Sequence, residues 1–140
     1  MRGRILLPFL ILVALTPGCI SLRWGFHATY VAHTKVAREA LAAKAEELGI
    51  GERSGGLVSN VTADRLLPTL PANQKEEAKE IIVSYQWGVA SDTADMLVIS
   101  CPANLRASPA LVETRRFIEK ILGPELMRLL RVHSEVFPEA

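Results

Sequence analysis

Cys101 is the residue of this chain whose chemistry could make it a catalytic nucleophile, because a thiolate forms covalent intermediates readily. A reactive thiolate needs a neighbouring base or a cationic pocket that lowers its pKa. The sequence alone does not show such a neighbour for Cys101. We therefore interpret Cys101 as a buried free cysteine. A hydrolase-like enzyme that uses Cys101 is kept as an alternative.

Carboxylates of the kind used in acid–base pairs occur at two places in the sequence. Asp92 and Asp95 form one group, and a second group contains Glu76, Glu77 and Glu80. Both groups are expected at helix starts, where carboxylates cap the helix or face the positive end of its dipole. This position explains them without catalysis, so the sequence predicts no catalytic residues.

The three histidines do not have the spacing of a zinc site. His27 and His33 are six residues apart and His133 is remote, whereas zinc ligands on a helix lie three or four residues apart. The sequence also contains no Walker loop, no G-x-S-x-G and no C-x-x-C motif. We therefore predict no metal and no cofactor.

Length and composition indicate one globular domain. The chain has 140 residues, of which 49% are hydrophobic and 22% charged, close to ordinary globular usage. Without Arg2 and Arg4, 14 of the 16 basic residues remain against 15 acidic ones, a net charge of −1. This balance argues against nucleic acid as a partner.

Residues 1–18 have the three regions of a secretory signal peptide in the right order. Arg2 and Arg4 precede an apolar run from Ile5 to Leu15, and Thr16-Pro17-Gly18 follows it. The run is short beside the roughly 20 apolar residues of a transmembrane helix. The alternative is an uncleaved N-terminal helix in a single-pass accessory subunit of a membrane complex.

Leu15-Thr16-Pro17-Gly18-Cys19 resembles the lipobox of bacterial lipoproteins, in which a small residue precedes an obligatory cysteine. Thr16 and Pro17 differ from the residues usual at their positions. The resemblance implies cleavage after Gly18 and lipidation of Cys19, with fatty acyl chains such as palmitate anchoring the protein in membrane lipid. It also implies a place in the bacterial cell envelope, at the outer membrane in a Gram-negative cell, because Ile20 rather than Asp follows the cysteine.

Residues 19–30 are expected to form a membrane-proximal anchor segment. Aromatic rings favour the headgroup region, where they find both apolar and polar surroundings. The predicted membrane-interface residues are Arg23, Trp24, Phe26 and Tyr30. In the alternative interpretation, these rings pack onto the domain.

Periodicity and helix signals predict a single helical domain over residues 31–140. The first helix is expected at 28–48 with Gly49 as its stop, and 57–71 as a turn of helix with an irregular connection. A helix from Asn73 to about Gly88 follows, although 81–100 also alternates as a β-hairpin would. Ser91 or Asp92 would cap another short helix. Ser108-Pro109 opens a helix that ends at Gly123-Pro124, and a last helix begins at Pro124.

The predicted fold is an all-α bundle of four or five helices after the anchor segment. Six basic residues against three acidic ones lie between Arg106 and Arg131. We interpret them as a solvated helix face with pairs such as Arg115 with Glu119, or else as a surface for anionic headgroups. The function predicted from an anchor and a core is that of a non-enzymatic adaptor, scaffold or accessory subunit with a protein partner in the envelope.

Overall fold

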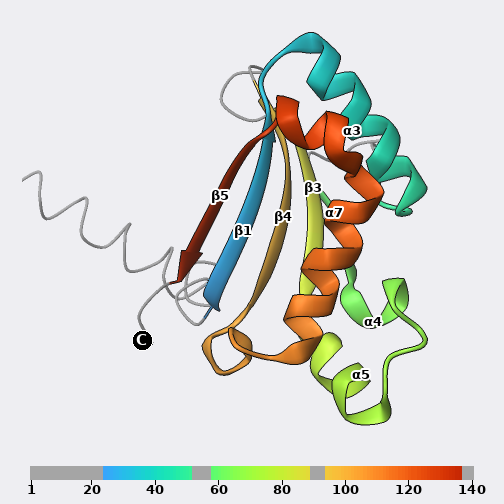
Figure 1. Cartoon of the computed structure of the whole chain (residues 1–140), viewed down its shortest axis with the longest axis vertical. Coiled ribbons are helices and arrows are strands. Elements are labelled where there is room, and N and C mark those ends of the chain that lie inside the picture. Colours follow the sequence, from blue (N-terminus) through green and yellow to red (C-terminus); the bar gives the residue numbers. More distant parts are fainter. Residues whose placement is uncertain (1–23, 52–57, 89–93, 137–140) are drawn as a thin grey trace, which may run out of the picture.

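A computed structural model describes residues 24–51, 58–88 and 94–136. The lipobox, Cys19, Arg23, Ser91 and Asp92 lie outside these residues. The described chain is an α+β fold built on one five-stranded sheet, with the strand order β2-β3-β4-β1-β5 (Figure 1). The all-α bundle predicted from the sequence is therefore wrong.

The described residues form five strands, four helices and one short 3-10 turn. In chain order they are β1 (Trp24–Ala32), α3 (Lys35–Glu47), β2 (Val58–Thr62), α4 (Ala63–Leu66), α5 (Ala72–Ala78), β3 (Ile82–Gly88), β4 (Ala94–Pro102), η1 (Ala103–Leu105), α7 (Pro109–Leu129) and β5 (Arg131–Val136). Because β1 starts at Trp24, the sheet domain includes much of the segment that the sequence assigned to the anchor.

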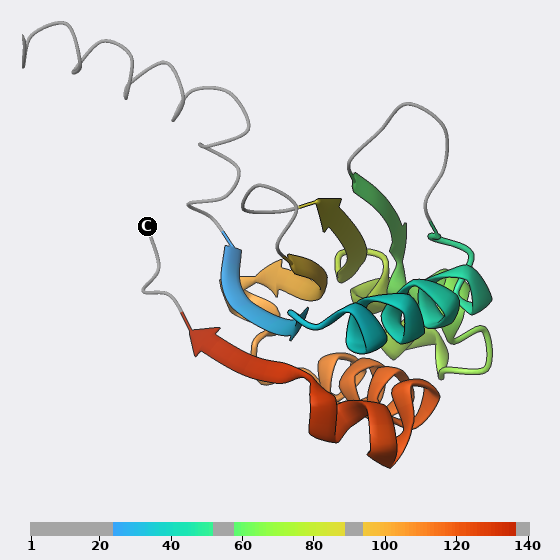
Figure 2. The ribbon, with the colours of Figure 1, turned by 90° about the horizontal axis from the view of Figure 1, so that it is seen from above.

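The sheet is antiparallel throughout, and its connections define its topology. β4 lies between β1 and β3 and pairs with both, while β1 lies between β4 and β5. The long helices α3 and α7 follow β1 and β4. This is the connectivity of a split βαβ, or ferredoxin-like, arrangement, with β2 added beside β3 as an edge strand. Figure 2 shows the described helices on one side of the sheet.

The segment from Ile81 to Trp87 is a strand because its side chains alternate between the two faces of the sheet. Ile81, Val83, Tyr85 and Trp87 are buried, whereas Ile82 and Gln86 are partly exposed. This period of two fits a strand and not a helix. The predicted helix to Gly88 is wrong beyond Ala78, and the hairpin alternative is confirmed by the pairing of β3 with β4.

The predicted helix at 28–48 is correct only after Thr34. Ala28, Tyr30 and Ala32 alternate as fully buried residues of β1, and α3 begins after the turn at residues 33 and 34. The Thr34 hydroxyl accepts the Ala37 N–H at 3.1 Å, which caps the helix. Gly49, with φ of +80°, ends it as predicted.

The predicted helix start at Ser108-Pro109 and the predicted break at Gly123-Pro124 are confirmed. Ser108 caps α7 by accepting the Ala110 N–H at 2.9 Å, and Pro109 is the first helical residue. Gly123 interrupts α7 with φ of +83° and ψ of 156°, so a second helical segment starts at Pro124. The stretch 57–71 contains β2 and only one helical turn, α4.

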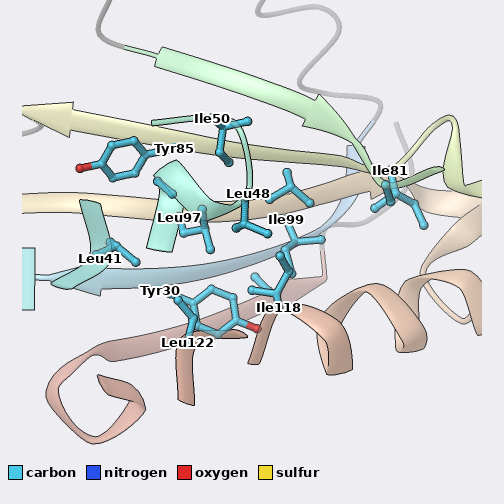
Figure 3. Packing of buried hydrophobic residues seen from close by; sticks show 14 of the residues in the cluster. Tyr30, Leu41, Leu48, Ile50, Ile81, Tyr85, Leu97, Ile99, Ile118 and Leu122 are labelled. Atoms are coloured by element: carbon cyan, nitrogen blue, oxygen red, sulfur yellow. The ribbon is translucent and has the colours of Figure 1, made fainter. Parts of the chain in front are cut away.

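The hydrophobic core lies between the sheet and the two long helices. The strands contribute Tyr30, Leu97 and Ile99, which pack beside Ile118 and Leu122 of α7 (Figure 3). α3 contributes Ala37, Leu41 and Ala45 at helical spacing. Burial of these side chains fixes both helices on one face and leaves two hollows where α3 meets its neighbours.

Candidate functional site

Tyr30 lies in the core and does not reach the surface. Its side chain is fully buried, and its hydroxyl donates a hydrogen bond to Glu119 Oε2 at 2.8 Å. Burial, and then this hydrogen bond, raise the pKa of Tyr30 well above its usual value. The Tyr30 ring thus packs into the domain, as in the alternative interpretation of this segment. Trp24 and Phe26 lie in β1, opposite Pro102 and Cys101 of β4.

The Cys101 thiol is buried in β4 and has no exposed surface. Removal from water disfavours the thiolate and raises the pKa of Cys101 to about 11. The sequence-based interpretation of a buried free cysteine is confirmed. At neutral pH this thiol is protonated inside the core, and we place no chemistry on it.

The first hollow, which we name the polar cleft, lies between α3 and the strands β3 and β4. It has a volume of about 240 Å³ and is lined by Lys35, Arg38, Glu39, Ala42, Tyr85 and Asp95. Asp95 forms its floor, with a side chain only 8% exposed. Arg38 Nη2 lies 3.4 Å from Asp95 Oδ1, and the Tyr85 hydroxyl donates to Asp95 Oδ2 at 3.2 Å.

The elements around Asp95 explain how a carboxylate comes to lie there. Asp95 stands opposite Ala32 at the end of β1, on the face that the helices cover. The first turns of α3 cross this end of the sheet and bring Arg38 over the carboxylate. The hydroxyl of Tyr85 lies away from the apolar side chains of the cluster (Figure 3). A carboxylate removed from water is costly unless such partners compensate it.

Sequence reasoning named Asp95 but placed it wrongly, as the partner of Asp92 near a helix start. Asp95 belongs to a strand, where Ala94, Leu97 and Ile99 around it are buried. An acidic residue inside an apolar strand is the signal that could have marked it. Lys35, Arg38 and Tyr85 carried no such signal, because their proximity depends on how α3 packs on the sheet.

The second hollow, which we name the α3–α7 groove, lies where α3 passes the bend of α7. Its volume is about 560 Å³, within the range of ligand-binding pockets. It is lined by Ala40, Lys44, Leu122, Gly123, Pro124, Glu125, Leu126 and Leu129. Ala40 is small, and Gly123 bends the helix, which together leave this space open. Leu129 is 50% exposed at its edge.

Two of the four basic residues of α7 pair with carboxylates of the same helix. Arg115 lies 3.8 Å from Glu119, and Arg116 lies 2.5 Å from Glu113. The expected pairing of Arg115 with Glu119 is confirmed. Arg115 also donates to Ser134 of β5 at 3.1 Å, so this part of the helix helps to hold the edge strand.

Residues 24–51, 58–88 and 94–136 contain no helix that is both long and apolar enough to span a membrane. Over the same residues, no three His, Cys, Asp or Glu side chains gather as metal ligands would. Comparison of the chain with models of known protein families, with curated proteins and with solved structures gives no match.

Proposed function

We propose that the protein is a lipid-anchored component of the bacterial cell envelope that binds a partner protein through the α3–α7 groove. Cys19 carries the acyl chains, and the sheet domain acts as a non-enzymatic adaptor. In a Gram-negative cell the anchor lies in the outer membrane. The observation that carries the binding role is the groove itself, which is open, mainly apolar and bounded by two helices.

The shape and chemistry of the α3–α7 groove favour an amphipathic helix as the partner's contacting element. Two helices form its walls, so a third helix can pack between them by the ordinary rules of helix packing. Leu129, which is half exposed, offers an apolar contact, while Lys44 and Glu125 place opposite charges on the two walls.

The position of the anchor relative to the groove supports the same role. Four residues separate Cys19 from Trp24, and the five Cα–Cα steps between them span at most about 18 Å, so an acyl anchor holds the start of β1 near the bilayer. β1 then runs for nine residues, or about 26 Å, toward Ala32. The second half of α7, with Gly123 to Leu129, leads to β5 beside Val31 at that far end. The groove is thus presented away from the lipid.

Site-specific photo-crosslinking in cells tests the proposed binding role. A photoreactive residue at Leu129 should give a discrete adduct with one envelope protein. The same residue at Val112, which is 48% exposed on the same helix but outside the groove, is the matched control and should not. Equal labelling at the two positions, or none at Leu129, would contradict the proposal.

The lipid anchor is tested separately from the groove. Cys19→Ala should abolish incorporation of labelled palmitate and release the protein from the membrane fraction, because two or three acyl chains are needed for stable anchoring. Wild-type protein that takes up no label would refute the anchor. The rival single-pass subunit differs in mass, since it retains residues 1–18.

A further inference from the structure

The polar cleft has the buried carboxylate of Asp95 at its floor, and binding of a partner at the α3–α7 groove does not explain this carboxylate. Asp95 lies on the core face of the sheet, yet a hollow of about 240 Å³ opens onto it. Four charged side chains line this hollow, although it lies on the opposite side of α3 from the α3–α7 groove. A concave site with a few convergent polar groups is a candidate for binding a small molecule.

We propose that the polar cleft binds a small zwitterion of the size and chemistry of a free amino acid, with its ammonium group at Asp95 and its carboxylate toward Lys35 and Arg38. This inference is independent of the anchor and of the α3–α7 groove. It follows from the volume of the cleft, the balance of its charges and the depth at which each charge lies.

The volume of the polar cleft sets the size of the ligand. About 240 Å³ is below the range of roughly 300–1,000 Å³ that holds drug-sized or cofactor-sized molecules. The cleft therefore suits a molecule smaller than a nucleotide or a coenzyme, such as one of the smaller amino acids.

The balance of charges sets the kind of ligand. The lining contains two cations, Lys35 and Arg38, and two carboxylates, Glu39 and Asp95. A simple anion would meet the carboxylates, and a simple cation would meet the basic residues. A molecule with one charge of each sign can place both of its groups against opposite charges, so a zwitterion is the class that this lining matches.

The depth of the charges sets the orientation of the ligand. Asp95 and the Tyr85 hydroxyl lie at the floor, where the side chain of Asp95 is 8% exposed. Arg38 is 32% exposed above them, and Lys35 is exposed at the rim in the first turn of α3. The positive end of the α3 dipole adds to these cations. The ligand's ammonium group therefore points inward and its carboxylate outward.

Asp95 has two partners in the polar cleft. Its distances of 3.4 Å to Arg38 and 3.2 Å to Tyr85 are longer than the 2.7–2.9 Å of strong charge-assisted hydrogen bonds. Because the carboxylate is already removed from water, a bond from the ligand's ammonium group forms in surroundings of low dielectric.

Calorimetric titration of the purified full-length protein tests this proposal. The probes are the twenty common amino acids, each tested singly, with the N-acetyl and the amide derivative of any that binds. We expect binding of at least one small amino acid and a loss of at least about tenfold in affinity for each derivative. Binding of none, or equal binding of the derivatives, would overturn the proposal.

Three variants locate the binding in the polar cleft. Asp95→Asn removes the charge at the floor with little change of shape and should weaken binding at least about tenfold. Lys35→Gln alters an exposed side chain, which keeps the test valid even if the Asp95 variant does not fold, and it should also weaken binding. Lys120→Gln makes the same substitution at an exposed lysine of α7 that lies outside the polar cleft; it is the matched control and should retain affinity. An unchanged affinity in Lys35→Gln would contradict the proposed orientation.

A fourth variant separates this proposal from the proposed function. Cys19→Ala removes the lipid anchor but leaves the polar cleft intact, so its amino-acid affinity should equal that of the wild type. If the anchor fails its own test while binding persists, only the localisation is wrong. If binding fails while palmitate labelling persists, only the ligand site is wrong.

Discussion

Gly123→Ala should destabilise the protein, although the same change in an uninterrupted helix would stabilise it. Gly123 has φ of +83° and ψ of 156°, a backbone region that residues with a side chain essentially do not occupy. An added Cβ would meet no atom within 4 Å, so the cost comes from the backbone alone. The expected loss in the free energy of unfolding is about 1–3 kcal/mol.

The sign of this change makes the test decisive. If α7 were one continuous helix, Ala would be favoured over Gly by about 0.8–1.0 kcal/mol. Urea denaturation of the purified protein at 25 °C measures the difference as a lower midpoint with an unchanged slope. Gly49→Ala, at φ of +80° and also without a nearby atom, is the matched control and should lose stability as well. A neutral or stabilising Gly123→Ala would refute the bend in α7 and with it the shape of the α3–α7 groove.

Three further predictions follow from the packing. Tyr30→Phe removes the hydrogen bond to Glu119 and should lower the free energy of unfolding by about 1 kcal/mol; an unchanged thermal midpoint would count against that bond. Thr34→Ala removes a helix cap and should lower the free energy of unfolding by about 1 kcal/mol. Ser108→Ala should lower it by more, because Ser108 caps α7 and also donates to Glu77 at 2.6 Å; equal denaturation midpoints would contradict this ranking. Cys101 should resist alkylation in the folded protein at pH 8. Because the folded-state pKa is raised from 9.0 to about 11, its contribution to stability is full below pH 9 and is lost as the pH rises toward 11. Cys101→Ala should lack that part of the alkaline decline in the free energy of unfolding.

Local signals in the sequence identified the ends of the helices more reliably than they identified the fold. Thr34, Gly49, Ser108 and Gly123 act through their own backbone and nearby N–H groups, so their effects are visible within a few residues. Gly49 and the Ser108-Pro109 pair were interpreted correctly for this reason. The sequence alone could therefore predict α7 and its interruption.

The sheet was harder to predict because the pairing of its strands is not local. β1 contains Ala28 and Ala32, which have high helix propensity, yet burial between β4 and β5 determines its conformation. The stretch Ile81–Trp87 was ambiguous, and the helical residues before it led to the wrong choice. In β1 and in Ile81–Trp87, tertiary packing against α3 and α7 determines that the backbone forms a strand.

The polar cleft could be predicted only in part. Asp95 is recognisable as a charge in an apolar strand, but its partners Arg38 and Tyr85 are distant in sequence and come from α3 and β3. No local pattern specifies that the start of α3 crosses the end of β4. The lipidation of Cys19, by contrast, depends on a local motif and needs no knowledge of the fold.

The intact mass of the protein purified from bacterial membranes tests the central claim most directly. If Cys19 is the anchor, the mass will correspond to the chain without residues 1–18, increased by the mass of two or three acyl chains. A mass that includes Met1, or an unmodified Cys19 thiol on water-soluble protein, would contradict the membrane-anchored adaptor.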